Sequence, residues 1–350
     1  MIGMVRCSSW ILVLTLVGQI MPVVADQPAA VRIAGSAWIG DAPTRLADHL
    51  DLFNQGRKVS EPRIEVLQFG SGHDAVVALM RGEAEFALGA TTPVAVALMG
   101  EMGEAGNRPV VLASLALSNR SHRIVVLPES GIRQPQDIQG RRVGVMMGTS
   151  SHFGWFHFSR FHGLDESSVE LVDLPVSAMA EAMLNGRIDA AVVWDPWDVE
   201  LARATGTTLI EFPLDAIYTV NWLLLADRQL AMSQPELLER VLHGYQAALA
   251  RMDSRSDETL SLLAGLFDTD VDSFLARTDG LLWRLGMNWS VLVSLGAQFD
   301  WLTAQPAFGQ QPAPSPSDYL LGEPLRRLSP RLVTVPPYLM VAETTSDTAP

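Results

Sequence analysis

The chain has 350 residues, 48% hydrophobic and 18% charged, which is enough apolar material for two domains with buried cores and excludes a disordered chain. Acidic residues outnumber basic ones by 39 to 25, the net charge is −14, and Lys58 is the only lysine. The sequence has no basic stripe with interleaved aromatic residues, so we expect no nucleic-acid partner and no anionic membrane surface.

The first 25 residues have the charged, apolar and small-residue order of a cleavable secretory signal. Arg6 precedes an apolar stretch over 10–17, and Ala25 ends a run of small residues. The apolar stretch is shorter than the roughly 20 residues that a membrane span needs. The single cysteine, Cys7, lies in this segment, so the mature chain has no disulfide and no cysteine nucleophile or metal ligand. We therefore expect export to the periplasm.

Two stretches share one pattern of strand, polar break, helix, glycine, acidic residue and strand. Their elements are expected at 64–67, 74–80 and 86–90, and again at 169–172, 178–184 and 190–194. Gly82 and Gly186 follow the helices, where a left-handed cap favours glycine. Each stretch is therefore a right-handed βαβ unit of a parallel sheet, and the duplication indicates two lobes built on one plan.

Between these units we expect strands at 124–127 and 142–146. The second strand leads into Gly148-Thr149-Ser150-Ser151 and a helix over 153–161. Backbone N–H groups, hydroxyls and the helix dipole at such a turn can cradle an anion. The alternative interpretation is that Ser150 or Ser151 simply caps the helix. Helices are also expected over 237–265 and 281–302.

In a doubly wound sheet a ligand binds outside the carboxyl ends of the strands. This rule nominates the residues that follow the expected strands: Trp38, Ser71, Gly72, His73, Ala90, Thr91, Thr92, Pro93, Ser177, Trp194, Asp195 and Pro196. The nucleotide-binding and nucleophile-elbow patterns are missing from the sequence. His152, His157 and His162 are five residues apart, a step of about 140° on a helix, so they share no face. We expect no catalytic residues, no metal site and no cofactor.

Several ordered segments resemble the nitrate/sulfonate/taurine branch of the solute-binding proteins of ABC importers, which also includes pyrimidine-precursor binders. These segments are 123–132, 137–145, 148–152, 186–197, 318–325 and 328–332. The resemblance implies a two-lobed α/β fold of the type II periplasmic-binding-protein class, each lobe a mostly parallel sheet flanked by helices, with a two-strand hinge. It suggests lobe I over 26–116 and 222–336, an inserted lobe II over 117–221, a signal peptide over 1–25 and a polar tail over 337–350.

The resemblance also implies a function without chemistry: a small anionic or zwitterionic organic solute, similar to an alkanesulfonate or taurine, is captured between the lobes and delivered to an ABC permease. Such receptors act as monomers. By position, the pocket residues of the family correspond to Trp38, Ser71, Gly72, Thr91, Thr92, Gly148, Thr149, Ser150, Trp194, Asp195 and Asn221.

Several alternatives stay open at this point. The expected pocket contains neutral donors and neither arginine nor lysine, which suits a sulfonate, although such donors do not distinguish sulfonate from carboxylate, nitrate or phosphonate. Asp195 is either the partner of a ligand ammonium or the cap of the next helix. The tryptophans suit an alkyl chain or a flat ring. An input module of a membrane kinase, or an enzyme on the same fold, are alternative functions.

Overall fold

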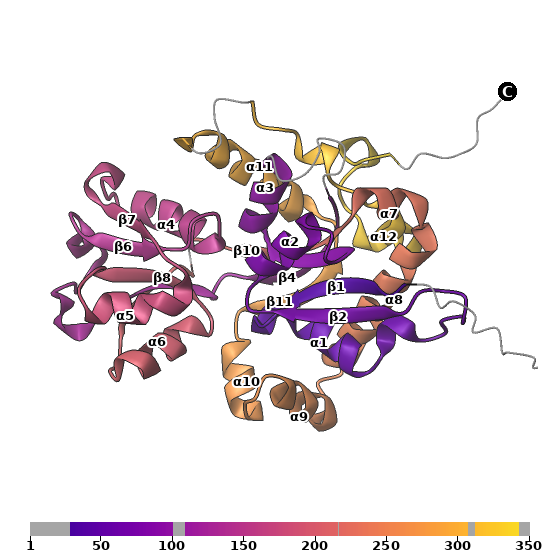
Figure 1. Ribbon diagram of the computed structural model, residues 1–350, viewed down its shortest axis with the longest axis horizontal. Helices are drawn as coiled ribbons and strands as arrows, with labels where there is room; N and C mark the ends of the chain where they lie inside the picture. The colour runs from indigo at the N-terminus through magenta and orange to yellow at the C-terminus, as the bar shows by residue number, and fades with distance from the viewer. Residues whose placement is uncertain (1–28, 101–108, 216, 307–311, 343–350) are drawn as a thin grey trace, which may run out of the picture.

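The computed structural model describes residues 29–100, 109–215, 217–306 and 312–342. The expected signal peptide and the part of the expected tail from residue 343 onward lie outside these residues. The described residues form two β-sheets flanked by helices, and Figure 1 shows the sheets side by side along the longest axis. No helix in the described ranges is long and apolar enough to cross a membrane.

The first sheet has six strands in the order β11-β4-β10-β3-β1-β2. Its strands are β1 (Val31–Ser36), β2 (Ile64–Phe69), β3 (Phe86–Ala90), β4 (Val110–Ser118), β10 (Val220–Ala226) and β11 (Leu281–Gly286). β1 runs parallel to β2 and β3, whereas β4, β10 and β11 are antiparallel to their neighbours. The helices of this half are α1 (Ala42–His49), α2 (Gly72–Met80), α3 (Thr91–Met99), α7 (Arg228–Ser233), α8 (Pro235–Asp253), α9 (Asp257–Leu266), α10 (Val271–Arg277), α11 (Trp289–Thr303) and α12 (Glu323–Leu328).

The second sheet has five strands in the order β7-β6-β8-β5-β9. Its strands are β5 (His122–Val126), β6 (Arg142–Val145), β7 (Glu170–Asp173), β8 (Ala190–Trp194) and β9 (Ile210–Pro213). Its helices are α4 (Ser150–Phe161), α5 (Met179–Leu184) and α6 (Trp197–Thr205). β6 is parallel to β7 and β8, and β5 is antiparallel to β8 and β9. Both sheets are therefore mixed rather than mostly parallel, because each combines a parallel βαβ core with antiparallel strands.

The two predicted βαβ stretches are confirmed, and a matching ion pair fixes each of them. In both sheets a middle strand, β1 or β6, lies between the two strands of the unit. Glu85 accepts the backbone N–H of Arg32 at 2.6 Å and pairs with its guanidinium. Asp189 accepts the backbone N–H of Arg142 at 2.9 Å and pairs with its guanidinium in the same way. The acidic residue before the last strand thus sets the register of that strand against the middle one.

The core of the first half follows β3 and β10, which are buried along their whole length. Both strands read as nearly continuous apolar runs because helices cover the sheet and leave neither face to water. Their ends at Ala90 and Val220 lie at the boundary with the second sheet, where they help to form the cavity described below.

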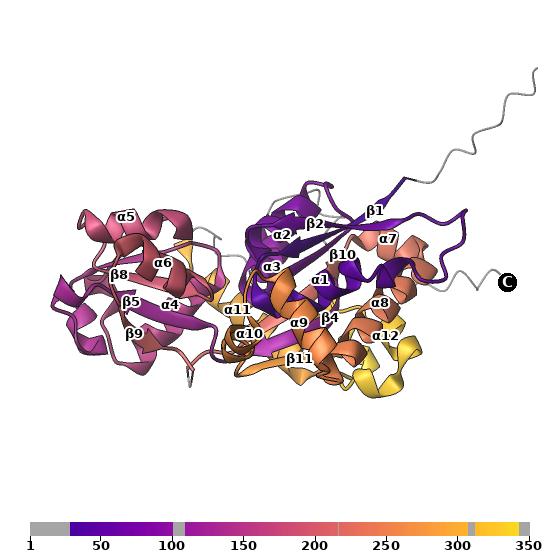
Figure 2. The ribbon, with the colours of Figure 1, turned by 90° about the horizontal axis from the view of Figure 1, so that it is seen from below.

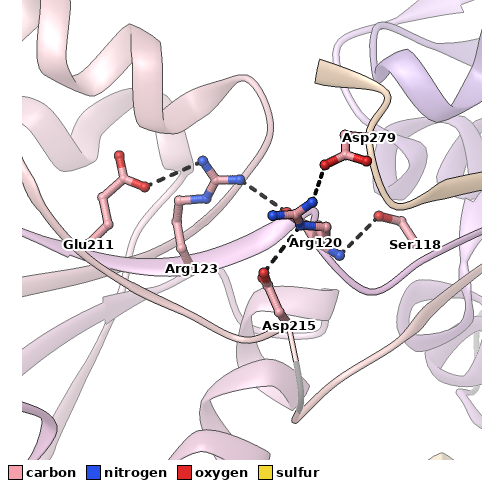
Figure 3. Close-up of polar contacts among 6 residues, drawn as sticks. All are labelled: Ser118, Arg120, Arg123, Glu211, Asp215 and Asp279. Atoms are coloured by element: carbon pink, nitrogen blue, oxygen red, sulfur yellow. Dashed lines mark hydrogen bonds and ion pairs between the residues drawn. The ribbon is translucent and has the colours of Figure 1, made fainter. Parts of the chain in front are cut away.

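The chain crosses between the sheets twice, after β4 and before β10, which are neighbours in the first sheet. Figures 1 and 2 show the two sheets as separate halves joined at this point. The guanidinium of Arg120, in the first crossing, contacts Asp215 in the second crossing at 3.3 Å and Asp279 in the loop before β11 (Figure 3). The lobe boundaries expected at 117 and 222 fall inside β4 and β10, and the division into lobes stays a prediction.

The helix expected over 281–302 is wrong at its beginning. Leu281–Gly286 is strand β11, which pairs with β4, and α11 begins only at Trp289, where the side chain of Asn288 caps it. The apolar spacing of this short segment fits either structure, and its pairing with a distant strand decides the outcome.

Candidate functional site

A cavity lies between the two sheets, where strand ends of the first sheet face the beginning of α4. About 410 Å³ of space lies between its walls, part of which is open to solvent. It is lined by Trp38, Ser71, Gly72, His73, Ala90, Pro93, Thr149, Ser150, Trp194, Val220 and Trp222. We call it the inner cavity. Its wall carries hydroxyls, backbone at two helix beginnings and three indoles, and neither arginine nor lysine.

Six residues of the expected pocket line the inner cavity together: Trp38, Ser71, Gly72, Thr149, Ser150 and Trp194. The strand-end rule also nominated His73, Ala90 and Pro93, and these line it too. The structure places the remaining expected residues elsewhere: Thr91, Thr92, Gly148, Asp195 and Asn221. Ser177 and Pro196, which the rule also nominated, do not line it either.

Asn221 faces away from the inner cavity because successive side chains of a strand point to opposite faces. Its neighbours Val220 and Trp222 line the cavity. The amide of Asn221 instead donates to the hydroxyl of Ser294 on α11 at 3.0 Å. Thr91 is fully buried, and its hydroxyl donates to the backbone carbonyl of Asn221 at 3.3 Å. These two residues therefore join the sheet to the helices behind it.

Ser71 and Gly72 form the beginning of α2 at the cavity wall. The Ser71 hydroxyl accepts the backbone N–H of Asp74 at 3.2 Å and donates to its carboxylate at 2.7 Å, so it caps the helix. A Cβ at Gly72 would lie 2.2 Å from the Trp222 ring and 3.1 Å from the Cα of Gly89. Glycine is therefore required at this position for the indole to lie against the turn.

In the turn before α4 neither Ser150 nor Ser151 caps the helix, so that alternative interpretation is wrong, whereas the anion cradle stays a prediction. Thr149 is the cap: its hydroxyl accepts the Ser151 N–H at 3.3 Å and donates to the Met146 carbonyl at 2.7 Å. Ser151 is also held by the loop, since its hydroxyl accepts the Met146 N–H at 3.1 Å. Gly148 has φ of +73°, a left-handed conformation that makes this turn possible. The hydroxyl of Ser150, unlike those of Thr149 and Ser151, does not bond to the loop and points toward the second sheet.

Ser150 contacts His122, a residue that the sequence did not nominate. The Ser150 hydroxyl lies 2.8 Å from Nε2 of His122, and Nδ1 of the same ring lies 2.8 Å from the hydroxyl of Ser121. Burial, together with the positive charge of Arg123, lowers the pKa of His122 to about 3, so the ring is neutral. Only its place at the start of a buried strand could have marked this histidine in the sequence.

Two of the three tryptophans in the cavity wall pack against each other. The rings of Trp38 and Trp222 lie 4.7 Å apart, tilted by 52°, and Trp222 Nε1 donates to Asp41 at 3.3 Å. Asp41 is buried and also accepts the Ser36 N–H at 2.6 Å. Burial raises the pKa of Asp41 to about 7, against the lowering effect of its hydrogen bonds. His73, a titratable residue in the cavity wall, shifts in the other direction: burial disfavours its charged form and so lowers its pKa.

A second hollow, which we call the outer cavity, shares Trp38 with the inner cavity and contains about 770 Å³ of space, part of which is open to solvent. Asp195 lines it, 8% exposed, with its carboxylate 3.5 Å from Nη2 of Arg277 on α10. Burial raises the pKa of Asp195, and the charge of Arg277 opposes that shift. Asp195 does not cap α6, because the cap of that helix is Pro196 and no side chain caps it. The charged partner of this carboxylate in the structure is therefore Arg277, at the wall of the outer cavity.

Known proteins resemble this chain over different lengths. The taurine-binding periplasmic protein of Escherichia coli strain K12 is 26% identical over 173 residues, which cover 49% of this chain and 51% of the relative. The match thus spans about half the length of that protein. Among solved structures, the alkanesulfonate-binding protein SsuA from Xanthomonas axonopodis pv. citri bound to MOPS has a TM-score of 0.70 at 18% identity, over 85% of this chain and 100% of that one.

The same fold also occurs in an enzyme. The desulfurization enzyme DszB superimposes with a TM-score of 0.60 at 18% identity, over 87% of this chain and 99% of that one. At such identities these structures establish a shared two-lobed α/β fold. A comparison of the sequence with protein families gives a longer match than that with the taurine-binding protein: the family described as NMT1/THI5-like matches residues 63–258, more than half of the chain. The chain therefore belongs to the NMT1/THI5-like family.

Proposed function

We propose that this protein is a periplasmic receptor that binds a small anionic or zwitterionic organic solute between its two sheets and delivers it to an ABC permease. The observation that carries the proposal is the inner cavity, where the beginning of α4 with Ser150 faces the Ser71–Gly72 turn across a wall of indoles. We further propose that it is exported through a cleavable signal over 1–25 and acts as a monomer.

The chemistry of the wall favours a sulfonate. Neutral hydroxyl and N–H donors at a helix beginning stabilise a negative charge without the strong attraction of a lysine or arginine. A weakly hydrated anion loses little on entering such a site. Trp38, Trp194 and Trp222 offer apolar surface to an alkyl chain or a ring. The names of the similar proteins, taurine-binding and alkanesulfonate-binding, agree with this solute class.

Two lobes that move about the crossings would enclose the solute. We propose lobe I over 26–116 and 222–336 and lobe II over 117–221, because the cavity takes its lining from both sheets. Asp195 is proposed as the partner of a ligand ammonium from the side of the outer cavity. Thr91, Thr92, Gly148 and Asn221 are proposed to support the site from behind its wall.

An enzyme on this fold is the second candidate, and one contact favours it: the Ser150 hydroxyl and His122 Nε2 are 2.8 Å apart, as in a nucleophile and its base. The lowered pKa of His122 argues against it, because a ring with a pKa of about 3 is a weak base. Ser121, rather than a carboxylate, contacts Nδ1. We therefore propose binding without chemistry.

The test is a melting-temperature screen of the exported protein after unfolding and refolding to remove any carried solute. The panel contains ethanesulfonate, taurine, benzenesulfonate, nitrate and an aminopyrimidine. A solute at 100 times its Kd adds about 2.7 kcal/mol, a shift of about 5–10 °C for a chain of this size. Ser150→Ala should reduce the shift, whereas Ser159→Ala, on the same helix but bonded to Glu166, should not. No shift with any anion would contradict the proposed site.

A further inference from the structure

Three buried side chains form a hydrogen-bonded row from the outer cavity to the inner one. The Ser121 hydroxyl lies 2.8 Å from Nδ1 of His122, and Nε2 of His122 lies 2.8 Å from the Ser150 hydroxyl. Ser121 lines the outer cavity and Ser150 lines the inner one. The exposed fractions of the three residues are 5%, 5% and 7%, so water competes little for these bonds.

The neutral ring of His122 carries one N–H donor and one acceptor nitrogen, and each hydroxyl can either donate or accept. The row therefore has two complete arrangements. In the first, Nε2–H donates to Ser150, Ser121 donates to Nδ1, and the hydroxyl proton of Ser150 is free to point into the inner cavity. In the second, Nδ1–H donates to Ser121, Ser150 donates to Nε2, and Ser150 offers only its lone pairs to the cavity.

Two aromatic side chains and a fixed stretch of backbone surround the His122 ring. His122 packs edge-on against Tyr218, with ring centroids 5.2 Å apart, and lies 6.4 Å from Trp194 in the cavity wall. The backbone on one side is also fixed, because the Ser121 carbonyl accepts the N–H of Asp195 at 2.9 Å. The His122 ring therefore has a hydrogen-bond partner at each nitrogen, Ser121 at Nδ1 and Ser150 at Nε2.

We propose that His122 is a positioning residue for the solute: it holds the Ser150 hydroxyl as a hydrogen-bond donor to a bound anion through its Nε2–H tautomer. An anion in the inner cavity accepts hydrogen bonds and therefore selects the first arrangement. The second arrangement would place an oxygen lone pair against the anion. This inference rests on the proposed function and names how one residue of that site recognises charge.

Binding affinities distinguish this role from a merely structural one. Ethanesulfonate is the probe, because it carries an anion and no ammonium, and its Kd is measured by calorimetry. We expect Ser150→Ala and His122→Phe each to raise Kd about tenfold, the range of a hydrogen bond to a charged group. The double variant should be no weaker than either single variant, since the two side chains act as one unit. Ser159→Ala is the control and should leave Kd unchanged.

A spectroscopic measurement reports the tautomer directly. In protein labelled with ¹⁵N histidine, the protonated and unprotonated ring nitrogens have distinct signals, and His122→Gln identifies those of His122. We expect the Nε2–H form once ethanesulfonate is bound. The same His122→Gln variant, whose amide can still donate to Ser150, should bind better than His122→Phe. If the phenylalanine variant does not fold, the tautomer of the bound protein still tests the proposal.

The outcomes separate the two proposals. If ethanesulfonate binds with the same Kd to the unsubstituted protein and to His122→Phe, or if the bound protein shows the Nδ1–H form, the role of His122 is contradicted and the receptor function stands. If the unsubstituted protein binds neither ethanesulfonate nor taurine, the proposed function fails, and the inference that depends on it fails with it.

Discussion

Trp222 donates its indole N–H to the buried carboxylate of Asp41 at 3.3 Å, and this bond fixes a ring that forms one wall of the inner cavity. Asp41 belongs to the turn before α1, and Trp222 belongs to β10, 181 residues later in the chain. The same carboxylate accepts the backbone N–H of Ser36 at the end of β1. A single buried acid therefore ties together the end of a strand, the beginning of a helix and the cavity wall.

Asp41 should make stability depend on pH between about 4 and 7. Burial raises its pKa from the ordinary 3.8 to about 7, so in this window the folded state keeps a proton that the unfolded state has released. The stabilisation is complete below about pH 4 and falls by up to about 1.4 kcal/mol per unit as pH rises to 7. The free energy of unfolding, measured with urea at pH 5, 6 and 7, should therefore change less with pH in Asp41→Asn than in the unsubstituted protein. Asp300→Asn, on the exposed face of α11, is the control and should keep the pH dependence of the unsubstituted protein. The same pH dependence in Asp41→Asn would contradict the role given to Asp41.

Gly72→Ala should damage the inner cavity through Trp222. The added Cβ would lie 2.2 Å from the indole, with backbone 3.1 Å away on the other side, so the ring must move. We expect a loss of about 1–3 kcal/mol in the free energy of unfolding and weaker solute binding. Gly70→Ala is the matched control, since its Cβ would meet only the Asp74 carboxylate at 3.8 Å. Equal melting temperatures for the two variants would show that the turn adapts without moving the ring.

Asp195→Asn should separate zwitterionic from purely anionic solutes. If the carboxylate holds an ammonium, the substitution should raise the Kd of taurine about tenfold and leave that of ethanesulfonate unchanged. Affinity for taurine should also weaken as pH falls through the raised pKa of Asp195, because the protonated acid no longer attracts the ammonium. Calorimetry with both solutes measures this, with Glu181→Gln on the exposed side of α5 as the control. The same change for both solutes would assign Asp195 a role in the wall alone.

Asp189→Asn should loosen the second sheet. The carboxylate lies 3.0 Å from Nε and 2.9 Å from Nη2 of Arg142, and this hydrogen-bonded pairing lowers the pKa of Asp189. Its stabilisation is therefore present above the pKa of the unfolded chain and is lost as pH falls through the lowered value. Because Arg142 is partly exposed, we expect a loss of only about 1 kcal/mol at pH 7. Urea unfolding checks this against Glu129→Gln, in the exposed turn after β5, which should change little.

The repeated βαβ unit could be predicted because its signals are local. Gly82 and Gly186 both adopt a positive φ at the ends of their helices, and the acidic residue three positions later pairs with the middle strand. Strand β11 could not be predicted in this way. Leu281–Gly286 has an ambiguous apolar spacing, and its partner strand β4 lies more than 160 residues earlier in the chain.

The site shows the same division between local and distant information. Residues that follow strands, such as Ser71 and Gly72, were found because the ends of parallel strands meet at one edge, and Thr149 was found as part of a polar turn at a helix beginning. Asn221 was expected in the pocket only from its position in the family resemblance, but a shift of one residue along a strand exchanges the faces, and Trp222 lines the cavity instead. His122 was missed because only the packing of β5 against the beginning of α4 shows what its ring contacts.

The pairing of β4 with β10 has a consequence for how the molecule is put together. Ser118 and Val220 lie opposite each other in adjacent antiparallel strands, although about one hundred residues separate them in the sequence. Two strands in that relation are ordinarily joined by a turn of two to five residues. In architectural terms the second sheet occupies the place of a hairpin loop. Excising 119–219 and closing the gap with such a turn would leave the strand order of the first sheet intact. The second sheet is therefore an insertion into a hairpin of the first sheet, and it supplies the opposite wall of the cavity.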